Sequence, residues 1–115
     1  EINKDALKMA WARLHERIRR IKLGGGKARL KKLNDQGKLS ARERINKLVD
    51  NPNEIFEIGV LAADKMYEEH GGCPSAGVVV VIAHVSKKRC VIVANDPTVK
   101  AGAWFPMTAK KNLRA

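Results

Sequence analysis

The stretch VVVVIAHVSKKRCVIVAND, residues 78–96, sets the architecture of the chain. Two β-branched runs, residues 78–85 and 89–96, flank the turn at residues 86–88, which is the pattern of a β-hairpin. The four valines at residues 78–81 do not alternate with polar residues, so we expect both faces of the first strand to be covered. In a chain of 115 residues with few aromatic side chains, we expect part of that cover to come from sequence outside the chain.

The residues that follow the hairpin predict a turn, a loop and a helix. Pro97 has no N–H group to donate to a strand ladder, so we expect the second strand to end near Ala94. Trp104 and Phe105 lie in the next loop, and each can bury a large apolar surface. Thr108 is expected to cap a helix that runs to the end of the sequence.

The first half of the chain predicts three helices. The first of them, residues 5–23, has an apolar stripe at spacings of three and four: Leu7, Trp11, Leu14, Ile18 and Ile21. Glycines at residues 24–26 interrupt the pattern before a short helix that ends at Gly37. Ser40 and Glu43 form a capping box for a third helix, which stops at residues 51–53. A short strand at residues 55–58 and a long loop lead to the hairpin.

Charge is distributed unevenly along the chain. The net charge is +11, and residues 1–48 hold 15 of the 23 basic and 5 of the 12 acidic side chains. Nucleic acid, anionic lipid and polyanionic small molecules are therefore the first partners to consider. No apolar run approaches the roughly 20 residues that cross a bilayer, so we expect no membrane-spanning segment. Among the basic residues of the second and third helices, residues 27–47, no aromatic residue is interleaved, which disfavours a nucleic-acid-binding module.

Other motifs have ordinary structural interpretations. The glycines before Lys27 lack the spacing of a phosphate-binding loop, so we interpret them as a flexible joint between helices. His70 and Cys73 lie in a glycine-rich loop without a third orienting group, which disfavours a catalytic pair. Cys73 and Cys90 have no partner histidine at zinc spacing, so we expect no metal site and a reducing, intracellular compartment. The chain begins without Met and ends within a short helical pattern, so we interpret it as a fragment.

Two long segments carry a family resemblance. The segments GKLSARERI at residues 37–45 and VIVANDPTVKAGAWFPMTAKK at residues 91–111 resemble the carboxyltransferase β subunit of biotin-dependent acyl-CoA carboxylases. That group includes propionyl-CoA and methylcrotonyl-CoA carboxylases, and HGGCPSAG at residues 70–77 favours methylcrotonyl-like members. The resemblance covers the chain from Ile18 onward.

The resemblance implies an α/β fold in which this chain begins a crotonase-like (ClpP/crotonase) superhelix. It assigns residues 1–115 to the N-terminal part of the carboxyltransferase N domain, with a basic helical segment at 1–50 and a hairpin and helix start at 54–115. It further implies an acyl-CoA-binding site, a hexamer, a biotin carboxyl carrier and a biotin carboxylase component, in the bacterial cytoplasm or mitochondrial matrix. Biotin would be on the carrier and not on this chain. The catalytic oxyanion loops of the family would lie beyond residue 115, so we expect the isolated chain to be inactive and assign it no catalytic residue.

The candidate functional residues are cations for the phosphates of coenzyme A: Arg42, Arg44, Lys38 and Lys100. Arginine often binds phosphate through two parallel hydrogen bonds. For each of the four, a structural ion pair or an exposed charge is the alternative. A nucleic-acid-binding module and a subunit of a related biotin-dependent acyl-CoA decarboxylase also remain open as functions, and the acyl chain is not indicated.

Overall fold

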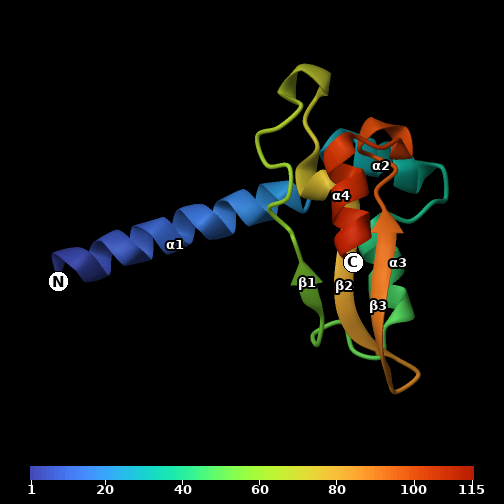
Figure 1. Ribbon diagram of the computed structural model, residues 1–115, viewed down its shortest axis with the longest axis horizontal. Coiled ribbons are helices and arrows are strands. Elements are labelled where there is room, and N and C mark those ends of the chain that lie inside the picture. Colours follow the sequence, from blue (N-terminus) through green and yellow to red (C-terminus); the bar gives the residue numbers. More distant parts are fainter.

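A computed structural model describes residues 1–115 and shows helices followed by a three-stranded antiparallel sheet (Figure 1). The strand order in the sheet is β1-β2-β3. The helices and strands are α1 (Ile2–Ile21), α2 (Lys27–Asp35), α3 (Ala41–Leu48), β1 (Phe56–Ile58), β2 (Val78–Val85), β3 (Lys88–Asn95) and α4 (Pro106–Arg114). None of the helices has the length and apolar character that crossing a membrane requires.

The predicted hairpin is confirmed, with a tighter turn than expected. Val85 pairs with Lys88, so only Ser86 and Lys87 form the turn, and both have positive φ. This backbone conformation is unfavourable for residues other than glycine. The carboxylate of Asp50 accepts hydrogen bonds from both turn N–H groups, at 2.8 Å from Ser86 and 2.7 Å from Lys87. Asp50 follows α3, so the end of that helix stabilises the turn.

One face of β2 packs against α3. The buried cluster on this face consists of Ala41, Ile45, Val49, Val79, Val81 and Ala83. Ile92 and Ala94 of β3 extend it, because they pair with Val81 and Val79 in register and lie on the same face of the sheet. Ser40 is the N-cap of α3, and its Oγ accepts the N–H of Glu43 at 3.2 Å, which is the first hydrogen bond of the predicted capping box.

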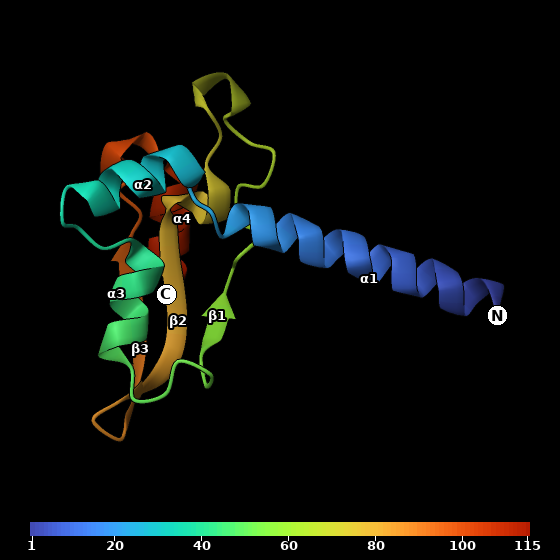
Figure 2. The ribbon, with the colours of Figure 1, turned by 180° about the vertical axis from the view of Figure 1, so that it is seen from behind.

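The opposite face of β2 is covered by α4 and the short 3₁₀ helix Pro74–Gly77 (Figure 2). Val78 and Val80 are on this face and are almost completely buried. The chain therefore covers all four valines of residues 78–81 itself, and the prediction that part of this cover lies outside the chain is wrong for them. On the same face of the sheet, Val91 and Val93 of the neighbouring strand β3 are half-exposed.

The helix α4 begins earlier than predicted. Pro106 is its first residue, a position where the missing N–H group of proline costs nothing. Thr108 is therefore not the cap but the third residue of the helix, and its Oγ1 accepts the N–H of Phe105 at 3.2 Å. Phe105 is buried and its ring stacks on Tyr67 at 4.2 Å, as expected of an anchor, whereas Trp104 stays half-exposed.

The helix α1 projects from the rest of the chain (Figure 1). Its bounds agree with the predicted helix to within a few residues, but of its apolar stripe only Ile21 is buried. Arg17 forms an ion pair with Asp64, which lies in the loop between β1 and β2. Of the other stripe residues, Ile18 is partly buried, whereas Leu7, Trp11 and Leu14 are exposed.

The glycine joint between α1 and α2 is tightly packed, not flexible as the sequence suggested. A Cβ atom on Gly25 would lie closer than 3.0 Å to the carbonyl oxygen of Thr98, and one on Gly24 would meet the carboxylate of Asp96. The N–H of Gly25 donates to Thr98 Oγ1 at 2.9 Å. Only glycine permits the two halves of the chain to approach this closely.

We expect Gly25→Ala to lower the free energy of unfolding by about 2–3 kcal/mol, because the new methyl group meets backbone that cannot yield. Gly37→Ala is the matched control: Gly37 has open space around its Cβ position but a φ of +74°. Its loss comes from backbone conformation alone and is expected to be about 1 kcal/mol. Urea denaturation measures the loss in free energy of unfolding for both variants. Equal losses would contradict the close packing of Gly25.

Candidate functional site

A basic groove runs between α2, the start of α3 and residues 95–102. It consists of two adjoining cavities of about 550 and 620 Å³ that share Leu33, Lys38 and Pro97. Five cationic side chains line it: Arg29, Lys32, Lys38, Arg44 and Lys100. Neither cavity is lined by a carboxylate, so the groove favours a ligand that carries several negative charges.

The two arginines are oriented by backbone carbonyl groups. Arg29 Nη1 donates to the oxygen of Thr98 at 3.1 Å, and Arg44 Nη2 donates to the oxygen of Asn95 at 2.7 Å. Each guanidinium group uses one of its five N–H donors in this way, so the others remain for a ligand. The side chains of Lys32 and Lys38 form no hydrogen bond or ion pair within the chain, so both can act as free point charges.

The floor of the groove is a rigid turn. Asp96 Oδ1 accepts hydrogen bonds from the backbone N–H of Thr98 at 2.9 Å and from its hydroxyl at 2.5 Å. On the far side of the turn, Lys100 Nζ lies 4.1 Å from the centre of the Phe105 ring. This cation–π contact keeps the ammonium group of Lys100 at the edge of the groove.

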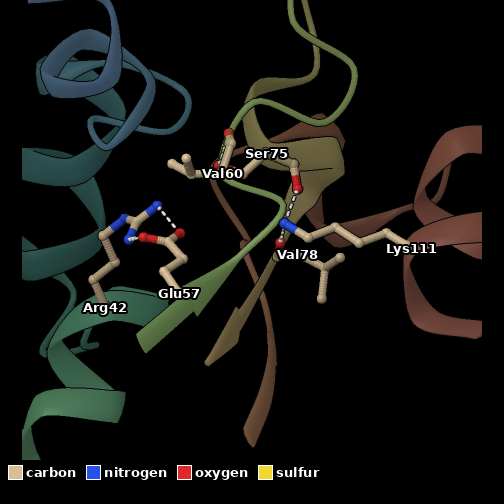
Figure 3. Close-up of polar contacts among 6 residues, drawn as sticks. All are labelled: Arg42, Glu57, Val60, Ser75, Val78 and Lys111. Atoms are coloured by element: carbon tan, nitrogen blue, oxygen red, sulfur yellow. Dashed lines mark hydrogen bonds and ion pairs between the residues drawn. The ribbon is translucent and has the colours of Figure 1, made fainter. Parts of the chain in front are cut away.

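The structure brings together three of the four candidate cations, Lys38, Arg44 and Lys100, and places Arg42 elsewhere (Figure 3). Arg42 donates two hydrogen bonds to the carboxylate of Glu57, at 2.9 and 2.8 Å. The pair is partly buried and joins α3 to β1. Arg42 therefore has the structural ion pair that was its alternative interpretation.

The sequence-based candidates did not include Arg29 and Lys32. These two residues are three apart in α2, and with Leu33 and Gln36 they occupy one face of the helix that lines the groove. The spacing was visible in the sequence. What no local pattern shows is that this face lies opposite residues 97–101.

A second polar cluster surrounds a buried lysine. Lys111 Nζ donates to the carbonyl oxygens of Ser75 at 2.9 Å and Val78 at 2.7 Å (Figure 3). Burial lowers the pKa of Lys111 to about 8; the nearby carboxylate of Glu57 opposes the shift, and the guanidinium group of Arg42 adds to it. Lys111 attaches α4 to the start of β2, so its role here is structural.

Cys73 does not have the surroundings of a nucleophile. Cys73 is buried, and this burial raises the pKa of its thiol, with a hydrogen bond from Thr108 opposing the shift. His70 lies against the ring of Phe105 and beside Glu69. No three His, Cys, Asp or Glu side chains gather in a way that could hold a metal ion. The chemistry that the described residues support is anion binding.

Comparisons with known proteins identify relatives of this arrangement. The family described as the carboxyl transferase domain matches residues 32–115. The biotin-dependent 3-methylcrotonyl-coenzyme A carboxylase beta1 subunit of Mycobacterium tuberculosis is 43% identical over 104 residues, which is 90% of this chain and 19% of the relative. The methylmalonyl-CoA decarboxylase subunit alpha of Veillonella parvula is 34% identical over 104 residues, 88% of this chain and 20% of the relative.

Solved structures show the same fold. The hexameric transcarboxylase 12S, crystallised with methylmalonyl-coenzyme A and methylmalonic acid, superimposes with a TM-score of 0.84 at 26% identity. The match covers 93% of this chain and 21% of that one. The predicted crotonase-like fold is therefore confirmed, and the chain spans about a fifth of the length of the relatives that it matches.

The shifted pKa of Lys111 predicts a pH dependence of stability. Between the folded pKa of about 8 and the usual value of 10.5, the unfolded chain binds more protons at this site than the folded chain. The free energy of unfolding should therefore rise with pH across this window, by up to about 3 kcal/mol from this group. The Lys111→Met variant lacks this titrating group, so its free energy of unfolding should rise less with pH across the window.

Lys110→Met is the control, because Lys110 is the exposed neighbour of Lys111 in the same helix. Urea denaturation at intervals from pH 7.5 to 10.5 measures the slope for the three proteins. Parallel profiles for Lys111→Met and the unmodified chain would show that Lys111 titrates normally.

Proposed function

Because the chain belongs to the carboxyl transferase domain family, we propose that it forms part of the acyl-CoA-binding N domain of a biotin-dependent carboxyltransferase. Such an enzyme moves a carboxyl group from carboxybiotin to an acyl-CoA. The similarity to a methylcrotonyl-CoA carboxylase subunit favours an acyl-CoA carboxylase as the parent enzyme. The proposal concerns the whole enzyme, of which this chain covers about a fifth of the length.

The observation that carries the proposal is the carboxylate-free groove with five cations. Coenzyme A carries a diphosphate and a 3′-phosphate, which are several negative charges within one extended molecule. Arg29 and Arg44 supply planar guanidinium groups for paired hydrogen bonds to phosphate oxygens. Lys32, Lys38 and Lys100 supply compact charges that adapt to the position of each phosphate. Arg42 is omitted because its guanidinium group is already paired with Glu57.

The groove also has apolar walls. Leu33, Leu39 and Pro97 line the same cavity as the cations Lys38 and Arg44. A ligand that combines phosphates with a ring or an alkyl segment can bury its apolar part there while its charges reach the rim. A simple inorganic anion would use only the cations. This combination suits a nucleotide-containing ligand such as coenzyme A.

The catalytic step belongs to other parts of the proposed enzyme. Carboxyl transfer to an acyl-CoA passes through an enolate, which fixed hydrogen-bond donors stabilise. We assign no such donor to this chain. Biotin would arrive on a carrier protein that a biotin carboxylase component loads, and the enzyme would be a homo-oligomer, with a hexamer expected. Bacterial and mitochondrial relatives support a cytoplasmic or mitochondrial matrix location.

A decarboxylase subunit is the second candidate. The similarity to the methylmalonyl-CoA decarboxylase subunit of Veillonella parvula supports it. Both enzymes would bind an acyl-CoA and use biotin, and they differ in the direction of carboxyl transfer. The cations of the groove suit the acyl-CoA of either enzyme. The nucleic-acid-binding alternative has no support among these relatives.

We expect the charge-reversing changes Lys38→Glu and Arg44→Glu each to weaken coenzyme A binding by about tenfold, which is about 1.4 kcal/mol. Each change removes a cation from the groove and adds a repulsive carboxylate. Isothermal titration calorimetry of the 115-residue chain with coenzyme A measures the loss. 3′-Dephospho-coenzyme A should bind more weakly than coenzyme A to the unmodified chain and should lose less affinity in the variants.

Arg13→Glu is the control, since it changes the net charge equally on α1 and lines neither cavity. Unchanged coenzyme A affinity in Lys38→Glu and Arg44→Glu would refute the groove as the site. A parallel titration with duplex DNA at two salt concentrations tests the nucleic-acid alternative. Tight, sequence-independent DNA binding with a steep salt dependence would support that alternative instead.

A further inference from the structure

His70 lines the basic groove from a segment that supplies none of the five groove cations. It belongs to the loop between β1 and β2, and it borders the cavity of about 620 Å³ together with Arg29, Lys32 and Lys100. Figure 1 shows this loop and the residues that follow β3 at the same end of the sheet. Histidine changes its charge between pH 5 and 8. His70 is therefore the one side chain lining the groove that titrates near neutral pH.

Aromatic packing holds His70 at this position. The centre of its ring is 5.8 Å from that of Phe105, and the ring of Tyr67 stacks on Phe105 at 4.2 Å. The carbonyl oxygen of Tyr67 accepts the N–H groups of His70 and Gly72, both at 2.9 Å, which closes the turn. The hydroxyl of Tyr67 accepts the N–H of Met107 at 3.3 Å, so the turn is attached to the start of α4. These contacts fix the backbone of His70 at the wall of the cavity.

Phe105 also holds a second nitrogen donor of the same cavity. Lys100 Nζ lies 4.1 Å from the centre of the Phe105 ring, and Lys100 and His70 both line the cavity. The side chain of His70 is 61% exposed, so its ring nitrogens are accessible to a ligand. One buried aromatic ring thus positions a lysine and a histidine that are far apart in the sequence.

The carboxylates near His70 lie on its own turn and do not line the cavity. Glu69 Oε1 is 3.8 Å from His70 Nε2, and the side chain of Glu69 is 70% exposed. The adjacent Glu68 also lies outside the cavity, whose charged residues are Arg29, Lys32, Lys38 and Lys100. Glutamate ionises below the range in which histidine titrates, and tyrosine and lysine ionise above it. Burial raises the pKa of the Cys73 thiol, so this neighbour stays neutral there as well.

We propose that protonated His70 is a sixth cationic ligand of the groove, and that phosphate binding there becomes stronger as the pH falls from 7.5 to 5.5. The inference rests on the proposed function, because it concerns the same groove, and it adds a pH dependence to that function. Protonated histidine has two N–H donors, so one can stay near Glu69 while the other donates to a phosphate oxygen. Binding and protonation then favour each other, and the complex takes up protons as it forms.

The test uses 3′-dephospho-coenzyme A as the probe. Its diphosphate keeps the same charge between pH 5.5 and 7.5, whereas a phosphate monoester such as the 3′-phosphate of coenzyme A titrates near pH 6. Isothermal titration calorimetry of the 115-residue chain should show an affinity about three- to fivefold higher at pH 5.5 than at pH 7.5, which is the scale of one exposed charge pair. Titrations at pH 6.5 in two buffers of different ionisation enthalpy should show the uptake of a fraction of a proton.

Two substitutions at residue 70 separate its charge from its packing. His70→Gln should bind the probe at pH 5.5 as weakly as the unmodified chain does at pH 7.5, and without proton uptake. His70→Lys carries a positive charge at both pH values, so it should bind at both with the affinity that the unmodified chain has at pH 5.5. Circular dichroism and the urea midpoint at each pH check that both variants keep the fold.

His84→Gln is the matched control, because it removes an exposed histidine of β2 that lines neither cavity. This variant should keep the full pH dependence of the unmodified chain. A pH dependence that persists in His70→Gln would assign the effect to another group and overturn the inference.

Failure of the inference differs from failure of the proposed function. If the affinity for the probe does not change with pH while Lys38→Glu still weakens binding, the groove is the site and His70 is not part of it. If neither coenzyme A nor 3′-dephospho-coenzyme A binds at any pH, the groove is not the site, and the role of His70 is refuted with it.

Discussion

The close contact between Gly25 and the backbone of Thr98 joins the start of α2 to the turn that follows β3. Gly25 lies between α1 and α2, and Thr98 lies just after β3. The contact fixes where α2 lies relative to the turn at Asp96, and that position creates the groove. A Cβ atom at residue 25 would lie closer than 3.0 Å to the carbonyl oxygen of Thr98, so the start of α2 would have to move away from this turn. The two cations on α2, Arg29 and Lys32, therefore depend on a residue that carries no charge.

Two arginines of α3 illustrate how one helix serves two purposes. Arg42 and Arg44 are separated by a single residue, which turns their side chains about 200° apart around the helix axis. Arg42 faces β1 and is paired with Glu57, while Arg44 faces the groove and contacts Asn95. Two basic residues of one helix turn thus divide between a structural ion pair and a candidate binding surface.

The sequence predicted the elements of the fold better than their contacts. The β-branched runs gave both hairpin strands, and Ser40 gave the start of α3, because these signals act within a few residues. The start of α4 was missed because Thr108 resembles a cap, although Pro106 already fits the first helical position. The groove was only partly foreseen. Its cations come from residues 29–44 and 100, and their approach depends on the packing of glycines against a distant turn, which no local pattern encodes.

The carboxylate of Asp50 gives the hairpin a dependence on α3. Two-residue turns with positive φ usually recruit asparagine and glycine, which lets a hairpin form by itself. Here the turn residues are Ser86 and Lys87, and the compensating hydrogen bonds come from a residue 36 positions earlier in the chain. The hairpin consequently gains its full stability only after α3 has docked. Strand pairing and the docking of α3 therefore stabilise each other.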